Sequence, residues 1–241
     1  MSGSPTLLRI FGAGLRAQVA VDQIAWHFKE KYVVEGYYDD KLPVGSAGPN
    51  GFPVLGTIDQ GVAETPGSGA QVYLAMGTYR SWRSCELFAE FLAKGLTFAR
   101  LIAPTAHVSP SAVIGENALI FGGVFVGSEA VVGHLFTAHG GTVVEHHCTV
   151  GHNVLLGPGV TLAGLTQIED HCFLGSGTSS KPRTRVASGT MTGAGSVVIA
   201  DLPPGVIAAG VPAVRQRDVT ENDEVPHPSV VKRLQGIFGE Q

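Results

Sequence analysis

The sequence predicts two architectures in one chain: an α/β part with a parallel sheet, followed by an all-β solenoid of six-residue repeats. Two observations predict them. Apolar runs alternate with stretches of helical spacing up to residue 104, which is typical of strands and helices that build a parallel sheet. From His107 to Leu202 the sequence then divides into sixteen consecutive hexads without an insertion. Neither the helical period of about 3.6 nor the two-residue period of a strand gives a repeat of six.

The N-terminal part begins with the apolar run LLRIFG, which leads into a glycine turn. The expected elements that follow are a helix at 15–31, strands at 32–40 and 70–77, a helix at 81–95 and a closing segment at 97–104. The Gly- and Pro-rich residues 42–69 are expected to form a long irregular connection. This alternation predicts a Rossmann-like parallel sheet over residues 1–104.

The turn GAGLRA, which starts at Gly12, matches the glycine-rich phosphate loop between a strand and a helix. Gly12 and Gly14 allow the backbone to approach a phosphate, and the helix N-terminus favours its negative charge. Arg16 can bind a phosphate through its guanidinium group. Asp39 and Asp40 end the next strand, where they can accept hydrogen bonds from a ribose or a base. Because about one hundred residues supply barely one of the two halves of a dinucleotide fold, we expect a nucleotide-linked sugar rather than NAD. A tight turn without a ligand is the alternative.

The hexads define the second part. Position two is Val, Ile or Leu in thirteen of the sixteen units, and position six is small or β-branched in fourteen. This pattern predicts a short strand and a turn, with the aliphatic side chain inward. Glycine recurs at position three, where we expect it to relax the backbone near the bend. Stacked units bury a continuous core and pair with the coils above and below.

Composition limits the functional classes. The chain of 241 residues has a net charge of −4, which argues against nucleic acid as a partner. It has no apolar run of the roughly eighteen residues that a membrane span requires. Three cysteines without a CxxC pair indicate reduced thiols, and the N-terminus lacks the features of a signal peptide. We therefore expect a cytoplasmic protein without a membrane or nucleic-acid partner.

Six of the nine histidines lie between His134 and His171. Five of these are at turn positions, where their rings are expected to point outward: His134, His146, His147, His152 and His171. His134, His152 and Asp170 are each eighteen residues apart. They are expected to stack on one edge of successive coils, at about the 4.8 Å spacing of neighbouring strands. An exposed histidine is most often plain solvated surface, which is the expectation for His171.

The stretch VVEHHCTVG places Glu145, His146 and His147 at one turn. Together with GYYDD, LIAPTAHVSPSAVIGENALIF and DLPPGVIAAGVPA, it resembles the bacterial sugar acyltransferases related to sialic acid O-acetyltransferase, which include N-acetyltransferases of nucleotide-linked amino sugars. The resemblance runs from about Ile10 to Ala213. It implies the left-handed parallel β-helix of hexapeptide-repeat proteins, with three units in each coil. It also implies a homotrimer with an acyl-CoA groove between adjacent prisms.

The resemblance implies a catalytic centre. In the family, the histidine of the EH-acid-C hexad is the general base and the acid after it orients the ring. Carried over, His146 is the base, His147 stands where the acid belongs, and Glu145 is the nearest spare carboxylate. A neutral imidazole is suited to take the proton of an amine or hydroxyl that attacks the thioester of acetyl-CoA. No metal is expected, and a backbone N–H from residues 157–164 is expected to stabilise the oxyanion.

The acyl-CoA residues are implied by position. Gly164 matches a family position where pantetheine passes close to the backbone, and Gly157 begins the same region. Lys181, in the basic stretch KPRTR, is expected to meet CoA phosphates, with a solvated basic turn as the alternative. Two departures lie beside the expected thioester: His139 stands where relatives have asparagine, and Leu155 where they have a second histidine.

The sequence thus predicts a nucleotide-sugar-binding domain at 1–104, an acyltransferase β-helix at 105–213, and a tail at 214–241 with a short helix at 228–238. The predicted function is acetyl transfer from acetyl-CoA to the amine, or hydroxyl, of a nucleotide-linked sugar. Two alternatives stay open. One is a γ-carbonic-anhydrase-like metalloenzyme, favoured by the spacing of His134 and His139. The other is a non-catalytic β-helix binding protein.

Overall fold

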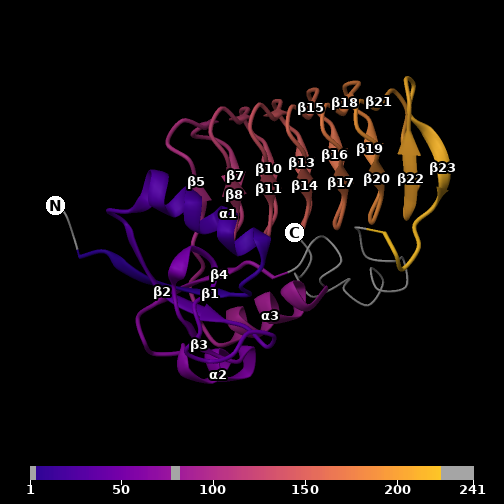
Figure 1. Ribbon diagram of the computed structural model, residues 1–241. Helices are drawn as coiled ribbons and strands as arrows, with labels where there is room; N and C mark the ends of the chain where they lie inside the picture. The colour runs from indigo at the N-terminus through magenta and orange to yellow at the C-terminus, as the bar shows by residue number, and fades with distance from the viewer. Residues whose placement is uncertain (1–3, 77–81, 224–241) are drawn as a thin grey trace. The chain divides into compact units, whose positions relative to one another are not determined.

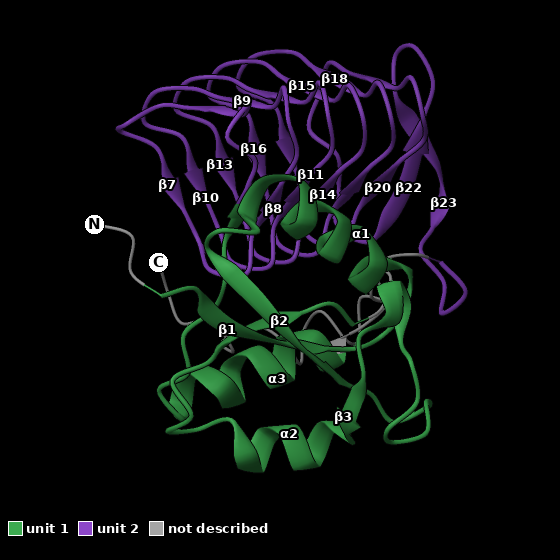
Figure 2. Cartoon of the chain, turned by 60° about the vertical axis from the view of Figure 1, so that its left-hand side comes forward, with its two compact units in different colours: residues 1–101 green, residues 102–241 purple. Residues whose placement is uncertain are grey.

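A computed structural model of the chain describes residues 4–76 and 82–223. It divides into two compact units, Met1–Leu101 and Ile102–Gln241, which Figure 2 colours separately. The sequence analysis placed this boundary slightly later, after residue 104.

The N-terminal unit contains a four-stranded sheet in the order β3-β2-β1-β4, and all its strand pairs are parallel. Its strands are β1 Thr6–Phe11, β2 Tyr32–Tyr38, β3 Val54–Gly56 and β4 Gln71–Leu74. Its helices are α1 Leu15–Gln23, α2 Ile58–Glu64 and α3 Trp82–Ala93, with a π-helical turn η1 at Ile24–Phe28 and a 3-10 turn η2 at Pro49–Gly51. The predicted α/β class with a parallel sheet is confirmed.

Aromatic side chains pack the core of this unit. Phe11 stacks on Tyr38 with ring centroids 5.0 Å apart, and Phe91 meets Phe11 edge-on at 4.7 Å. α2 lies close to this cluster at Gly61, where a Cβ would stand 2.4 Å from Cγ of Tyr38. The packing fixes the carboxyl ends of β1 and β2, where the predicted nucleotide residues begin.

The prediction for residues 42–69 was wrong, because this segment contains β3 and α2. β3 extends the sheet beside β2. α2 begins with a capping box in which Gln60 N–H donates to the Thr57 hydroxyl and Thr57 N–H donates to the Gln60 side chain. The spacing Thr-x-x-Gln is a sequence signal for a helix start, and the Gly and Pro content of the segment obscured it.

The C-terminal unit is a solenoid of three sheets, in which each of the sixteen hexads contributes one two-residue strand. The first sheet holds β7 Val113–Ile114, β10 Val131–Val132, β13 Thr149–Val150, β16 Gln167–Ile168 and β19 Arg185–Val186. The second holds β5 Leu101–Ile102, β8 Leu119–Ile120, β11 Thr137–Ala138, β14 Leu155–Leu156, β17 Phe173–Leu174, β20 Met191–Thr192, β22 Val206–Ala209 and β23 Val214–Asp218. The third holds β6 His107–Val108, β9 Phe125–Val126, β12 Val143–Val144, β15 Thr161–Leu162, β18 Ser179–Ser180 and β21 Val197–Val198.

Parallel pairs join residues eighteen apart, such as Val131 with Thr149, so that three strands complete one coil (Figure 1). Residues at position two point inward, and Val126, Val144 and Leu162 are fully buried in the shared core. The predicted parallel solenoid with its aliphatic interior is therefore confirmed.

Both ends of the solenoid differ from expectation. β5 already belongs to the second sheet, so coiling begins one hexad before His107. The segment 97–104 therefore does not simply close the N-terminal part. At the far end β23 pairs antiparallel with β22, which places a strand where the tail was predicted. The helix predicted at 228–238 lies outside the described residues.

Glycine at position three has a different role from the one predicted. Positive φ angles occur at position five, as at Asn117 (57°) and Leu165 (65°). At position three the neighbouring coil passes very close: a Cβ on Gly115 would lie 2.5 Å from the carbonyl carbon of Gly133. The glycine allows coils to stack, and the left-handed backbone that bends the corner falls two residues later.

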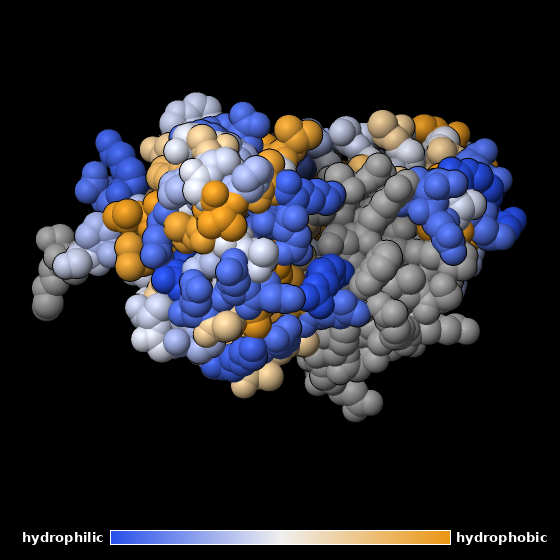
Figure 3. All heavy atoms as spheres, turned by 60° about the horizontal axis from the view of Figure 1, so that its bottom comes forward, coloured by the Kyte–Doolittle hydropathy of each residue, from blue (hydrophilic) through white to orange (hydrophobic). Residues whose placement is uncertain are grey.

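Among the described residues, no helix has the length and apolar character that crossing a membrane requires. Leu15 is 82% exposed and Trp26 is 77% exposed. On the face seen in Figure 3, outside the atoms drawn in grey, apolar residues form small groups separated by hydrophilic ones. Scattered apolar residues of this kind are ordinary on a protein surface.

Candidate active site

The turn 145–147 connects β12 to β13, at the corner between the third and first sheets. Leu165 N–H donates to the carbonyl of His146 at 3.0 Å, and His147 N–H donates to the carbonyl of Ser128 at 2.9 Å. The turn is thus bonded to the coil on either side. The side chains of His146 and His147 are exposed, as their turn positions predicted.

The two imidazoles contact each other. Nδ1 of His146 lies 3.2 Å from Nδ1 of His147, and the rings are nearly perpendicular, at 83°. Glu145 does not bond to either ring: its Oε2 accepts the backbone N–H of His146 at 3.3 Å. The side chain beside the predicted base is therefore His147.

The ring of His146 lies over Gly164 in the next coil. A Cβ on Gly164 would stand 2.6 Å from Nε2 of His146, so only glycine leaves room for the ring. The neighbouring amides are bonded, since Ala163 N–H donates to the hydroxyl of Ser180 and Leu165 N–H to His146. Within the described part of the chain, no acceptor is found for Gly164 N–H. A backbone donor is thus available beside the imidazole.

Gly157 and His139 lie at another corner, between the second and third sheets. Gly157 N–H donates to the carbonyl of Leu174 at 2.9 Å, so this amide is used by the coil ladder. His139 stacks on Phe121 with ring centroids 4.7 Å apart. Leu155 is in β14 of the second sheet. Within one chain, these residues do not share the corner of His146.

Lys181 lies on the His146 corner. Steps of eighteen residues lead along this edge from Ser128 through His146 and Gly164 to Pro182, with Lys181 and Arg183 on either side. Both basic side chains are exposed, and neither has an ion pair among residues 4–76 and 82–223. Because Pro182 lies two coils beyond His146, Lys181 and Arg183 are about 10 Å from His146.

The corner between the first and second sheets holds the predicted histidine stack. Glu116 N–H donates to Nδ1 of His134 at 2.9 Å, and His134 N–H to Nδ1 of His152 at 3.0 Å. His152 N–H donates to Oδ1 of Asp170 at 2.7 Å. The rings of His134 and His152 are 5.0 Å apart and nearly parallel, so the stacking prediction is confirmed.

These ladder histidines are less exposed than predicted. His152 is 4% exposed and His171 is 2% exposed. The expectation of plain surface for His171 was therefore wrong. Burial lowers the pKa of His152 to about 4, and it also lowers the pKa of His171 and of His134. The imidazole rings of His134, His152 and His171 are therefore neutral near pH 7.

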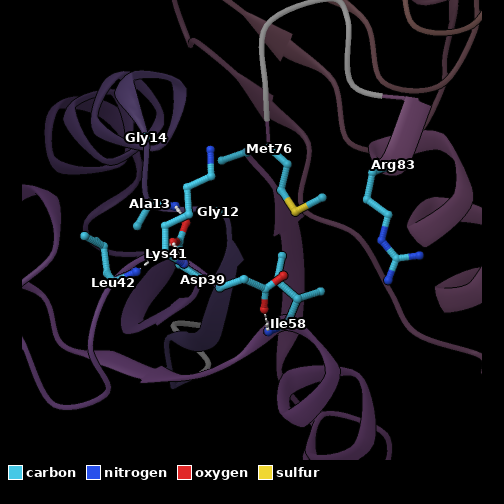
Figure 4. A pocket seen from close by; sticks show the side chains of 11 residues that line it. Gly12, Ala13, Gly14, Asp39, Lys41, Leu42, Ile58, Met76 and Arg83 are labelled. Carbon is cyan, nitrogen blue, oxygen red and sulfur yellow. Dashed lines mark hydrogen bonds between the residues drawn. The ribbon is translucent and has the colours of Figure 1, made fainter.

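The N-terminal unit has a cavity of about 500 Å³ at the carboxyl ends of β1, β2 and β4 (Figure 4). Its lining consists of Gly12, Ala13, Gly14, Asp39, Asp40, Lys41, Leu42, Ile58, Ala75, Met76 and Arg83. The structure thus brings together four of the five predicted substrate residues.

The two aspartates of this cavity hold loops. Asp39 accepts Ala13 N–H at 2.8 Å with Oδ2, and Lys41 N–H at 2.8 Å with Oδ1. Asp40 accepts Ile58 N–H at 2.9 Å. Because Ala13 N–H is bonded to a carboxylate, the glycine turn offers one amide fewer to a phosphate than the motif suggested.

Arg16, the fifth predicted residue, is not part of the cavity lining given above. It lies near the buried Tyr73, whose pKa burial raises and the positive charge of Arg16 lowers. Among the described residues that line the cavity, the cationic side chains are Lys41 and Arg83, on opposite sides of it in Figure 4. Sequence reasoning missed both. The position of Lys41 directly after the two aspartates was the available signal.

The described residues do not form a group of three or more His, Cys, Asp or Glu side chains that could hold a metal ion. His134 and His139, whose spacing favoured a carbonic-anhydrase-like centre, lie at different corners. Nδ1 of His134 already accepts a backbone N–H.

No protein-family model matches the sequence, and neither does any curated protein. Solved structures do. The acetyltransferase domain of PglB from Neisseria gonorrhoeae is 31% identical, with 87% of this chain and 98% of that chain covered and a TM-score of 0.76; it has also been solved with acetyl coenzyme A. PerB from Caulobacter crescentus, in complex with CoA and GDP-perosamine, is 28% identical, with 90% and 98% covered and a TM-score of 0.76. WeeI from Acinetobacter baumannii is 25% identical, with 87% and 100% covered and a TM-score of 0.72.

The solenoid and these similarities define a hexapeptide-repeat acyltransferase. The chain belongs to the nucleotide-sugar acetyltransferases of that family, to which the sequence analysis found a resemblance. The predictions of an enzyme, of acetyl transfer and of acetyl-CoA as co-substrate are confirmed at this level. Variants of the Caulobacter GDP-perosamine N-acetyltransferase with one histidine replaced were also crystallised with CoA and GDP-perosamine.

Proposed function

We propose that this protein acetylates the amine of a nucleotide-linked amino sugar, with His146 as the general base. The contact that carries the proposal is the ring of His146 over Gly164, which puts a basic nitrogen beside an amide donor that has no acceptor in the described chain. Transfer to a hydroxyl uses the same groups. The amine is favoured because the relative PerB is bound to GDP-perosamine, an amino sugar nucleotide.

The chemistry needs two groups on one rigid corner. The amine nitrogen attacks the thioester carbonyl, and its proton passes to Nε2 of His146. The carbonyl oxygen, which becomes negative, accepts a hydrogen bond from Gly164 N–H. When the C–S bond breaks, the thiolate takes the proton from Nε2 and CoA leaves as a thiol. General-base assistance contributes about 10²- to 10⁴-fold, and alignment of the two substrates contributes more.

The acyl donor fits along the corner edge. The exposed Lys181 and Arg183 offer positive charge to the CoA phosphates about 10 Å from His146 along the same edge. Gly157 and His139 lie at a different corner, so we propose that they reach the donor from the neighbouring prism of a left-handed, trimeric assembly.

The nucleotide is assigned to the cavity of the N-terminal unit, which we propose to be a Rossmann-like domain. Leu42, Ile58 and Met76 supply apolar walls for a base. Lys41 and Arg83 supply charge for the diphosphate, and Gly12 and Gly14 allow close approach. Asp39 and Asp40 shape the cavity through their loop bonds, and each retains lone pairs that can accept from a base or ribose. A cytoplasmic location follows from the use of acetyl-CoA.

Acetyl transfer is tested by thiol release from acetyl-CoA with UDP-, GDP- and dTDP-linked amino sugars. We expect turnover with one nucleotide class, and loss of kcat of at least about 10²-fold in His146→Asn. The variant is compared with the native protein by circular dichroism and by size-exclusion chromatography. Equal turnover by a folded His146→Asn variant would remove His146 as the base.

A further inference from the structure

The side chain that follows the proposed base differs from that of the family. The family pattern has an acid there, and this chain has His147. The Nδ1–Nδ1 distance of 3.2 Å between His146 and His147 is that of a hydrogen bond, and such a contact needs one proton between the two nitrogens. One imidazole donates and the other accepts.

We propose that His147 is the positioning residue for His146: its Nδ1 accepts Nδ1–H of His146 and so leaves Nε2 of His146 unprotonated over Gly164. This assignment rests on the proposed function, in which Nε2 takes the proton of the amine. When Nε2 is protonated, the Nδ1–H donor carries positive charge and its bond to His147 becomes stronger. The proton stays on His146 until the departing thiolate takes it from Nε2.

The backbone places His147 for this role. Its N–H is bonded to Ser128 of the preceding coil, its backbone has a φ of 56°, and its ring contacts that of His146. Nδ1 of a histidine and Oδ1 of an aspartate are both attached to Cγ, so they occupy similar positions. The ladder at the other corner uses both as acceptors in equivalent positions: Nδ1 of His152 accepts His134 N–H, and Oδ1 of Asp170 accepts His152 N–H one coil later.

A histidine in this position makes the base sensitive to acid in a way that a carboxylate does not. Once Nδ1 of His147 is protonated it cannot accept Nδ1–H of His146, so the pairing is lost. Acid inactivation therefore involves up to two protons. The charged groups near the pair are Glu145, whose carboxylate bonds the backbone of His146, Glu129 one coil before, and the cations Lys181 and Arg183 two coils beyond His147.

Two variants separate the hydrogen bond from the fold. His147→Asn keeps an acceptor, its Oδ1, at the same distance from the backbone, and asparagine already has this positive φ at Asn117 and Asn153. His147→Leu removes the acceptor, and leucine has the same backbone at Leu135 and Leu165. We expect His147→Leu to lower kcat about 10- to 100-fold, the usual cost of losing a partner that orients a functional imidazole, with KM for both substrates little changed. We expect His147→Asn to restore most of the loss.

The pH profile gives a readout that a purely structural role would not move. The acid limb of log kcat/KM should be steeper by up to one proton in the native enzyme than in His147→Asn, because asparagine does not titrate. Equal acid limbs, full activity in His147→Leu, or equal loss in the Leu and Asn variants would overturn the inference.

Two controls distinguish a failure of the His146–His147 pairing from a failure of the proposed function. If His146→Asn is inactive while His147→Leu is fully active, only the pairing is wrong; if His146→Asn is active, the proposed base is wrong. The tautomer is also measurable without substrate, by ¹⁵N NMR of histidine-labelled protein with His146 assigned from its variant. A proton on Nδ1 of His146 at neutral pH supports the pairing, and a proton on Nε2 overturns it.

Discussion

The histidine ladder makes the stability of the protein depend on pH. His152 has an ordinary pKa of 6.5 when unfolded, and burial lowers it to about 4 in the folded protein. Between these values the unfolded chain binds more protons, so the free energy of unfolding falls as pH falls from 6.5 towards 4. Protonation at Nδ1 also breaks the bond from His134 N–H. His171 is buried too, and its lowered pKa acts in the same direction.

The size of the effect follows from the shift. The difference in proton binding by His152 alone lowers the free energy of unfolding by about 2 kcal/mol between pH 7 and pH 5, and by about 3 kcal/mol at pH 4. The contribution is fully present above pH 6.5 and is lost on acidification. His171 increases the loss beyond these figures.

The substitution His152→Asn tests whether His152 causes this pH dependence of the free energy of unfolding. Asparagine Oδ1 takes the place of Nδ1, as Oδ1 of Asp170 already does one coil later, but it does not titrate. The smaller side chain lowers stability at every pH, so the comparison is between slopes. We expect native protein to lose about 2 kcal/mol more than His152→Asn between pH 7 and pH 5.

The assay is urea unfolding followed by circular dichroism at pH 7, 6 and 5, at one protein concentration, because assembly makes apparent stability depend on concentration. His107→Asn removes an exposed histidine and controls for the loss of a histidine as such. Identical pH slopes for native protein and His152→Asn would show that the ladder ring is not held neutral, and the reasoning from burial would be refuted.

Three further predictions concern the site and one helix. Gly164→Ala should lower kcat at least about 10-fold, as part of the 10²- to 10⁴-fold contribution of a general base, because its Cβ would stand 2.6 Å from Nε2 of His146; steady-state kinetics measure this, and normal kcat would show that the ring moves freely. Arg83→Gln should raise KM for the nucleotide-sugar several-fold with KM for acetyl-CoA unchanged, and an equal rise in both would contradict the nucleotide assignment. Thr57→Ala should lower the unfolding free energy by about 1 kcal/mol, measured by urea titration, and no change would mean that the capping box of α2 contributes nothing.

Counting hexads predicted much of the solenoid, because each position of the hexad has the same orientation in every coil. A position-two residue such as Val144 is inward in every coil, so pairing of residues eighteen apart and the corner position of His146 follow from counting alone. Exposure at the corners does not follow. His146 and His152 occupy the same position of their hexads, yet one is exposed and the other is 4% exposed. The period gives the hexad position of a corner residue and does not describe how far its side chain is covered.

In the N-terminal unit, the sequence predicted which residues form the site but not how they are hydrogen-bonded. The motif at Gly12 and the pair Asp39 and Asp40 were found from sequence, and the cavity lies where they meet. Their hydrogen bonds were not predictable from the motif. A glycine loop favours a phosphate only while its amides are free, and here Asp39 takes Ala13 N–H. The positive charges among the described lining residues are those of Lys41 and Arg83, and Arg83 reaches the cavity from α3, far along the chain.

The chemistry of the site follows from the order of groups along one corner. Ser128, His146, Gly164 and Pro182 succeed one another at eighteen-residue steps, so their separation is set by the coil spacing of about 4.8 Å and not by flexible side chains. His146, the amide of Gly164 and the cations beside Pro182 therefore follow one another along one corner, in the order that the proposed function requires for amine, thioester and phosphates. A substitution can alter one of these groups, but an insertion in any coil between them would shift the register of every later hexad.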